Sequence, residues 1–174
     1  MRLESGIVST RPIKGTRKRG RDDETDSELR HQLASSEKEV AEHLMLVDLE
    51  RHDLSRVCQT GSIHWSGWRI EALANVQHLV SGVEGKLSET VSAGHAVSAM
   101  FPGGSITGCP KTVTIAAINE LEGSPRGAWT GSMGHVHSGA GIADWNILIR
   151  TLEAHSGPNQ WYGTVQAGGG IVID

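Results

Sequence analysis

Lys14 is the side chain of this 174-residue sequence whose setting most suggests chemistry, since it lies in the short, β-rich stretch STRPIKGT. A lysine amine attacks an electrophile only when it is neutral, and an ordinary lysine, with a pKa near 10.4, is almost wholly protonated at neutral pH. Desolvation or nearby cationic groups would have to lower that pKa. The alternative is a solvated charge at the end of a strand.

Glu42 is a carboxylate that lies in line with leucines on a predicted helix. Glu42, Leu46, Leu49 and Asp53 follow the i, i+4, i+7, i+11 spacing of one helix face. A carboxylate in such a row could bind a hard cation such as Mg²⁺, which prefers oxygen ligands. The spacing alone favours the other interpretation, a surface ion pair with Lys38 one turn earlier.

Arg150 and a glycine-rich segment could bind anions. Arg150 stands in a predicted strand between Leu148 and Leu152, so that its guanidinium would be half-buried and would pair with a planar anion or, equally, with an internal glutamate. The segment FPGGSITGCPKT, residues 101–112, leads into a predicted helix whose free amides could bind an anion. Together with Glu42, these features suggest a carboxylate substrate bridged to a hard cation.

Composition and motif tests exclude several classes of function. Sixteen Lys and Arg against twenty Asp and Glu give a net charge of −4, which offers no general attraction to nucleic acid or to an anionic membrane. Apolar runs are far shorter than the roughly 20 residues of a membrane span, and no signal peptide opens the sequence, so we expect a cytoplasmic protein. GGSITGCPKT fails as a phosphate loop because Cys109 and Pro110 precede Lys111. Cys58 and Cys109 lack the spacing of a zinc site and are expected to be small buried residues.

The elements that must position these side chains follow from hydrophobic periodicity and capping signals. The length predicts one domain, and the pattern predicts an α/β (α+β) fold in which helices pack on an antiparallel sheet. A basic run followed by an acidic one predicts a solvated loop at 17–28. Ser35 or Ser36 is expected to cap the long helix, and Ser88 the next one. The expected strands are 7–13, 63–70, 76–87, 128–136, 144–154 and 161–167, and the expected helices are 35–57, 88–100 and 112–121.

Seven motifs give the sequence a resemblance to the chorismate-binding enzymes, in order, in approximate spacing and along nearly its whole length. They are RPIKGT, AEHLMLVDLERHDLSRV, HLVSGVEG, FPGGSITGCPK, ELEG, ILIRT and QAGGGIV. The resemblance implies that residues 1–174 form a partial chorismate-binding catalytic domain, a sandwich of antiparallel sheet with packed helices that lacks its N-terminal part and its C-terminal end. Two positions depart from the family pattern, since His52 stands where asparagine is usual and His135 where tyrosine is usual.

Within the family, the sequence is most similar to the aminodeoxychorismate synthase component I branch, which has lysine in the PIxGT motif where anthranilate synthases usually have a small residue. The resemblance implies that Lys14 attacks C2 of chorismate, and that ammonia from a glutamine amidotransferase partner then enters at C4. The product would be 4-amino-4-deoxychorismate, an intermediate of para-aminobenzoate and folate biosynthesis. The alternatives are anthranilate synthase component I, which releases pyruvate, and an inactive fragment that only binds.

The resemblance also assigns roles to other residues, one motif at a time. Glu42 would bind Mg²⁺, which reverses the preference from spacing. Gly15 and Thr16 would border the substrate carboxylate. The remaining expected contacts are His78 and Thr107 at the ring and its C4 substituent, Arg150 at the enolpyruvyl carboxylate, and Gly168 and Gly170 along the same pocket.

Overall fold

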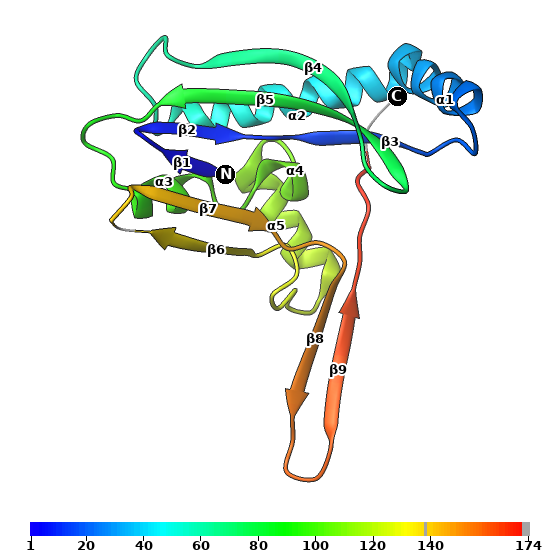
Figure 1. Ribbon diagram of the computed structural model, residues 1–174. Coiled ribbons are helices and arrows are strands. Elements are labelled where there is room, and N and C mark those ends of the chain that lie inside the picture. The colour runs from blue at the N-terminus through cyan, green and yellow to red at the C-terminus, as the bar shows by residue number, and fades with distance from the viewer. Residues whose placement is uncertain (138, 172–174) are drawn as a thin grey trace.

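One large antiparallel sheet organises the chain in the computed structural model, which describes residues 1–137 and 139–171. In the described part its strands are ordered β3-β5-β2-β1-β7-β6, and β4 pairs with β5. Figure 1 shows β2 and β3 following one another beside the long strand β5. The strands are β1 (Arg2–Glu4), β2 (Ile7–Thr10), β3 (Ile13–Lys18), β4 (His64–Ala72), β5 (Val76–Lys86), β6 (Ser132–His137) and β7 (Ile142–Ile147).

Helices pack on this sheet and enclose the core. The long helix α2 (Glu37–Ser55) contacts both β3 and β5, and α1 (Asp23–Ser35) contacts the same strands. The other helices are α3 (Ala93–Met100), the short α4 (Gly104–Thr107) and α5 (Lys111–Glu122). None of the helices in the described residues is long and apolar enough to cross a membrane. The core lies between the sheet and helices α2 and α3, with members that include Val8, Val47, Leu54, Val83, Ala96 and Met100. The predicted fold class, an antiparallel sheet with packed helices, is confirmed.

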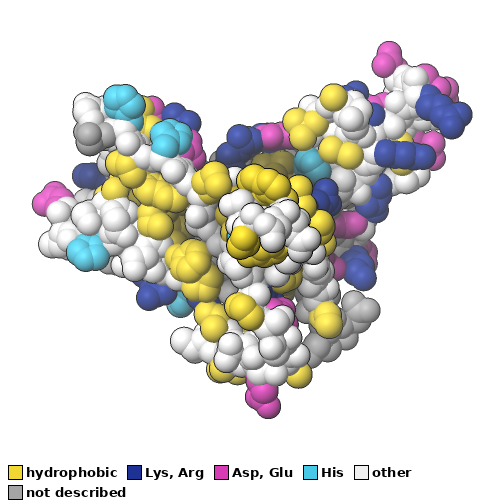
Figure 2. All heavy atoms as spheres, turned by 90° about the horizontal axis from the view of Figure 1, so that it is seen from below, with side chains coloured by type: hydrophobic (Ala, Val, Ile, Leu, Met, Phe, Trp, Pro, Cys, Tyr) yellow, Lys and Arg dark blue, Asp and Glu magenta, His cyan; other side chains and the backbone are white. Residues whose placement is uncertain are grey.

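Strands β8 (Thr151–Ser156) and β9 (Trp161–Gln166) form a separate hairpin that extends away from the sheet (Figure 1). Leu152, Trp161 and Val165 are 71%, 74% and 78% exposed on it. Figure 2, which views the molecule from below, shows hydrophobic side chains at the surface on this side. An isolated two-stranded hairpin is at best marginally stable in water, so the base of this one must be held by the rest of the chain. Glu153 provides such a contact, since its carboxylate accepts the backbone N–H of Ala128 at 2.8 Å.

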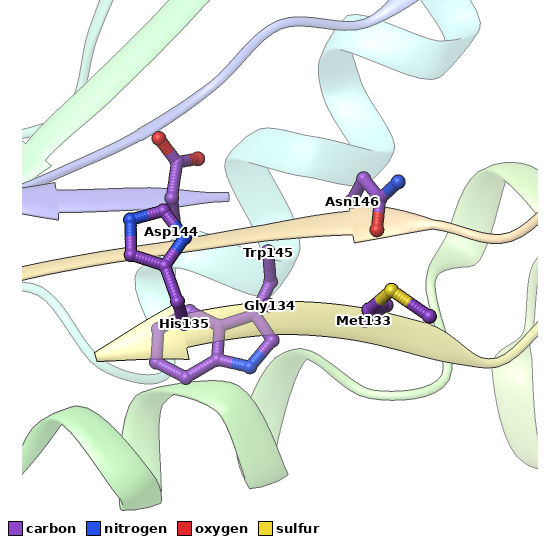
Figure 3. Close-up of a pocket in the computed structure, with 6 residues that line it drawn as sticks. All are labelled: Met133, Gly134, His135, Asp144, Trp145 and Asn146. Carbon is purple, nitrogen blue, oxygen red and sulfur yellow. The ribbon is translucent and has the colours of Figure 1, made fainter.

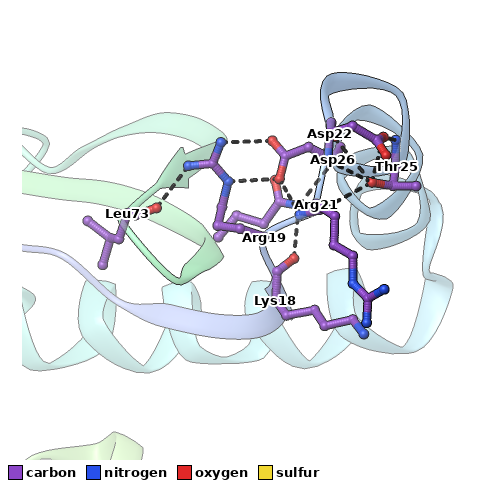
Figure 4. Close-up of polar contacts among 9 residues, drawn as sticks. Lys18, Arg19, Arg21, Asp22, Thr25, Asp26 and Leu73 are labelled. Atoms are coloured by element: carbon purple, nitrogen blue, oxygen red, sulfur yellow. Dashed lines mark hydrogen bonds and ion pairs between the residues drawn. The ribbon is translucent and has the colours of Figure 1, made fainter.

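The predicted loop at 17–28 is wrong, because its two charge runs belong to different elements. Arg17 and Lys18 end β3, and the acidic run begins α1, where negative side chains are favoured by the helix dipole. Asp22 caps this helix by accepting the N–H of Thr25. Figure 4 shows how Arg19 joins the two elements, with its guanidinium on the carboxylate of Asp26 at 2.7 and 3.0 Å.

The predicted strand at 144–154 is also wrong, since a break in the β structure at residues 148–150 separates β7 from β8. Arg150 lies in this break with φ = +50°, and its side chain is exposed rather than packed between leucines. A strand residue does not adopt that φ, so the expected placement of Arg150 between Leu148 and Leu152 on one strand face does not exist.

Three smaller expectations need correction. The helix expected to be capped by Ser88 is capped four residues later, by Ser92, which accepts the N–H of His95, and its first residue is Ala93. The helix expected at 112–121 begins one residue earlier, at Lys111, with Pro110 as its N-cap. Cys58 is buried as expected, but Cys109 is exposed.

Candidate functional site

A β-bulge in β3 sets the direction of Lys14. Ile13 pairs with Val80 and Thr16 with His78, so Lys14 and Gly15 together lie opposite the single residue Leu79. Such a bulge inserts one extra residue and re-aims the neighbouring side chain. Gly15 permits it, because its φ of +91° is unfavourable for other residues. A Cβ there would also be tightly packed, since it would lie 3.1 Å from both Glu39 Oε2 and Leu33 Cδ1.

Lys14 forms an ion pair with Glu42. Its Nζ lies 2.8 Å from Glu42 Oε2, which connects β3 to helix α2. The Lys14 side chain is 37% exposed and that of Glu42 only 14%. The hydrogen bond from Lys14, reinforced by the charges of Lys14 and Lys38, holds the pKa of the Glu42 carboxyl below its usual range. Among the described residues the ion-pair partner of Glu42 is thus Lys14, rather than the Lys38 that spacing alone favoured.

Thr16 and His78 form a second contact beside this pair. They are cross-strand neighbours on β3 and β5, and Thr16 Oγ1 lies 2.8 Å from His78 Nδ1. Thr16 is exposed and His78 is half-buried. Five predicted site residues, Lys14, Gly15, Thr16, Glu42 and His78, therefore lie on or against one stretch of β3.

Thr107 belongs to helix α4, which packs against a later part of α2 than Glu42. It is the last residue of α4, and its Oγ1 donates to the carbonyl of Gly103 at 2.9 Å. The start of the same helix, Gly104, packs against Leu49 and Asp53. Those two residues follow Glu42 by two to three helical turns, a separation of about 10–16 Å along the axis.

The other predicted contacts come from outside the sheet. Arg150 lies in the break before β8, and Gly168 and Gly170 follow β9. Gly168 lies against the indole of Trp129, since a Cβ on it would be 2.6 Å from Trp129 Cζ2, whereas Gly170 is in open space. Within residues 1–137 and 139–171, no hydrogen bond or ion pair connects these three to Lys14 or Glu42. Their roles in binding stay predictions.

His43 is a functional candidate that sequence reasoning missed. It is fully buried on α2, and its Nε2 lies 2.6 Å from the hydroxyl of Ser81, which also accepts the indole N–H of Trp65 at 3.1 Å. Burial lowers the pKa of His43, which favours a neutral imidazole. The signal was in the sequence, because His43 precedes the buried Leu46 and Val47 by three and four residues and so shares their helix face.

A buried charge cluster around Asp53 was missed as well. Lys111, at the start of α5, donates to both carboxylate oxygens of Asp53 at 2.7 and 2.9 Å, and the Asp53 side chain is only 4% exposed. Glu50 lies one turn earlier on α2, where burial and then the charge of Asp53 raise the pKa of its carboxyl. Lys111 is thus paired with a protein carboxylate.

A surface hollow of about 380 Å³ lies elsewhere, on β6 and β7 (Figure 3). It contains His135, at a position where the sequence departs from the family pattern, and Trp145, whose indole covers Gly134. None of the predicted catalytic, substrate-binding or metal-binding residues lines it, so it is not the candidate site. Its lining is Met133, Gly134, His135, Asp144, Trp145 and Asn146.

The residues present fit a Mg²⁺ ion only in part. The described chain holds no group of three or more His, Cys, Asp or Glu side chains that could bind a metal. Mg²⁺ is, however, commonly bound through one or two carboxylates with water and substrate as further ligands. Glu42 offers one such carboxylate, which Lys14 occupies.

Comparisons with known proteins find relatives of this chain. The chain is 47% identical over 175 residues to anthranilate synthase component 1 of Aquifex aeolicus, with 100% of this chain and 34% of the relative covered. It is 45% identical over 169 residues to aminodeoxychorismate synthase component 1 of Bacillus subtilis, with 97% and 35% covered. The crystal structure of anthranilate synthase component I from Streptococcus pneumoniae superposes with a TM-score of 0.75 at 38% identity, over 87% of this chain and 33% of that one.

The chain thus spans about a third of the length of the relatives that it matches. The family described as chorismate binding enzyme matches all of residues 1–174. On this match and on these identities, the chain belongs to the chorismate-binding enzyme family.

Proposed function

We propose that this chain carries the lysine-bearing part of an aminodeoxychorismate synthase component I, which converts chorismate and ammonia to 4-amino-4-deoxychorismate and water. The observation that carries the proposal is Lys14, a primary amine that a glycine bulge aims at the carboxylate of Glu42. Relatives of both activities match this chain at nearly equal identity, so overall similarity does not choose between them.

The reaction would proceed in two balanced substitutions. The Lys14 nitrogen bonds to C2 of chorismate, the electrons of both ring double bonds shift toward C4, and the C4–O bond breaks to release the hydroxyl, which leaves as water after taking a proton. Ammonia then bonds to C4, the electrons shift back, and the C2–N bond breaks to return the Lys14 amine. Covalent catalysis of this kind divides one difficult displacement into two easier ones.

The ion pair with Glu42 would be the resting state of the nucleophile. The lowered pKa of Glu42 keeps it ionised, so it orients the Lys14 amine rather than taking its proton. Attack requires a neutral amine, so Lys14 must leave this pair and lose a proton once substrate is bound. Mg²⁺, for which Glu42 would supply one carboxylate, would neutralise the carboxylate of the substrate and orient it.

The remaining expected contacts belong to the same proposal. Thr16 and His78, already joined by a hydrogen bond, would border the substrate beside Lys14. Thr107, Arg150, Gly168 and Gly170 would complete the pocket. A glutamine amidotransferase subunit would supply the ammonia.

Product analysis tests the proposal against anthranilate synthesis. Residues 1–174 would replace the matching third of the Bacillus subtilis relative, and this full-length graft would be assayed with chorismate, Mg²⁺ and ammonium, with the unaltered relative as positive control. We expect 4-amino-4-deoxychorismate without pyruvate, and loss of that product in the Lys14→Ala graft.

Two other outcomes would contradict the proposal. Stoichiometric release of pyruvate with anthranilate would assign the segment to the anthranilate branch. Binding of chorismate without turnover, in a graft whose circular dichroism matches that of the unaltered relative, would identify a segment that only binds.

A further inference from the structure

The segment between α3 and α5, residues 101–110, carries Thr107, whose hydroxyl donates to the carbonyl of Gly103 within the same segment. Five of its ten residues are Gly or Pro, namely Pro102, Gly103, Gly104, Gly108 and Pro110, and helix α4 within it is only four residues long. A segment of this composition has many alternative conformations. Something outside it must therefore set the place of Thr107.

Lys111 closes this segment. Its Nζ donates to both carboxylate oxygens of Asp53 and also lies 3.4 Å from the carbonyl oxygen of Met100. Met100 is the residue before the segment and Lys111 the residue after it. One ammonium group thus connects both ends of the segment to helix α2.

The carboxylate of Asp53 also lies against the start of helix α4. A Cβ on Gly104 would lie 3.5 Å from Asp53 Oδ2 and 3.5 Å from Leu49 Cδ2, so the backbone of α4 begins directly against α2 at this point. The N–H of Gly108 donates to the carbonyl of Gly104 at 2.8 Å, which closes the turn that ends in Thr107. A shift of Asp53 would therefore displace the start of α4 and, one helical turn later, Thr107.

The surrounding charges make Lys111 necessary to this arrangement. Asp53 is 3% exposed, and Glu50, one turn away on the same helix, is a second carboxyl in the cluster. A buried carboxylate that loses its cationic partner is strongly disfavoured. A buried ion pair is nevertheless weak evidence of net stabilisation, because its desolvation offsets its attraction, and its best-attested use is to fix one arrangement among several.

We propose that Asp53 and Lys111 are positioning residues of the catalytic domain, and that their partly buried ion pair, the Asp53–Lys111 clamp, holds segment 101–110 so that Thr107 faces the substrate. The clamp itself follows from the contacts above, and its role toward substrate rests on the proposed function. The clamp would also give a role to Lys111, the lysine of GGSITGCPKT, in a segment whose pattern does not match a phosphate loop.

Hydrogen exchange measured by mass spectrometry tests the clamp on the 174-residue chain without substrate. In Lys111→Met we expect exchange of the peptide amides in 101–110 to accelerate about tenfold or more, while those of β5 stay unchanged. Lys111→Arg should restore most of the protection, because a guanidinium can also bind both oxygens of Asp53. Lys86→Met, at an exposed lysine of β5, is the matched control and should change neither region.

Kinetics of the full-length graft test the positioning role. A displaced Thr107 should lower kcat by about 10- to 100-fold, with KM within about threefold, since other contacts bind the substrate. Lys111→Arg should recover most of kcat.

Two results would overturn the clamp. Exchange in 101–110 that is unchanged in Lys111→Met would show that the segment is held otherwise, and exchange that rises equally in β5 would show a purely global loss of stability. A graft with unperturbed Lys111 that fails to turn over chorismate would reject the proposed function, whereas the exchange result would still decide on the clamp.

Discussion

At the scale of single residues, the two buried or half-buried carboxyls of α2 respond to their surroundings in opposite directions. Glu42 has an ammonium partner 2.8 Å away, which lowers its pKa. Glu50 is desolvated beside another carboxylate, which raises its pKa. The sequence does not distinguish these two glutamates, because the partner of Glu42 comes from β3 and the burial of Glu50 depends on the packing of elements far away in the chain.

Replacing Glu42 by Gln should destabilise the chain at neutral pH and not at acid pH. The folded-state pKa of Glu42 is lowered, so its contribution is present above its unfolded-state pKa, near 4.3, and is lost as the pH falls through the folded-state value. Urea unfolding midpoints at pH 7 and pH 3 would measure this, with the exposed Glu89→Gln as control. A deficit of Glu42→Gln that persists unchanged at pH 3 would argue against the ion pair.

Replacing Glu50 by Gln should have the opposite pH dependence. The folded-state pKa is raised, so Glu50 favours folding below its unfolded-state pKa and loses that contribution as the pH rises through the folded-state value. The Gln variant should therefore gain stability relative to the natural chain between pH 4 and pH 8, as followed by thermal unfolding. A relative loss over the same range would contradict the desolvated environment.

At the scale of elements, capping and periodicity predicted what is local and missed what depends on backbone geometry. The helix at 35–57 was predicted well, since Ser36 does cap α2 by accepting the N–H of Glu39. The break at Arg150 was not, because an arginine with φ = +50° leaves no mark in the residue pattern. The bulge at Lys14 and Gly15 was hidden for a related reason, namely that a register shift is a property of two paired strands.

The bulge makes a specific prediction for Gly15. Gly15→Ala should lower the free energy of unfolding by about 1–3 kcal/mol, because it combines a positive φ with contacts at 3.1 Å. Gly67→Ala is the matched control, since Gly67 has a φ of +81° in β4 but open space around it, and should cost only about 1 kcal/mol. Equal losses in chemical denaturation would mean that the packing of Glu39 and Leu33 around Gly15 is looser than described.

At the scale of the whole molecule, helices pack on one large antiparallel sheet around a hydrophobic core. The hairpin of β8 and β9 extends away from that sheet. The sequence predicted β9 but joined β8 to β7 in one strand, and it did not predict the separation of the hairpin, which depends on contacts rather than on pattern. The side chains on one face of β8 and β9, those of Leu152, Trp161 and Val165, are largely exposed.

These exposures predict which apolar residues matter for the stability of this chain. Leu152→Ser and Trp161→Ser should each change the free energy of unfolding by no more than about 0.5 kcal/mol, because both side chains are more than 70% exposed. Leu54→Ala, at a fully buried core position, should cost about 2–5 kcal/mol. A large loss in either hairpin variant would show that this face is covered in solution.

The account depends most on Lys14 forming a bond to the substrate ring. The full-length graft would be incubated with chorismate and Mg²⁺ without ammonia, quenched, digested and mapped by mass spectrometry. We predict a peptide containing Lys14 that is heavier by the mass of chorismate less one water, and no such adduct in the Lys14→Ala graft. Full turnover with ammonium by that Lys14→Ala graft, or an adduct on a different residue, would contradict the account.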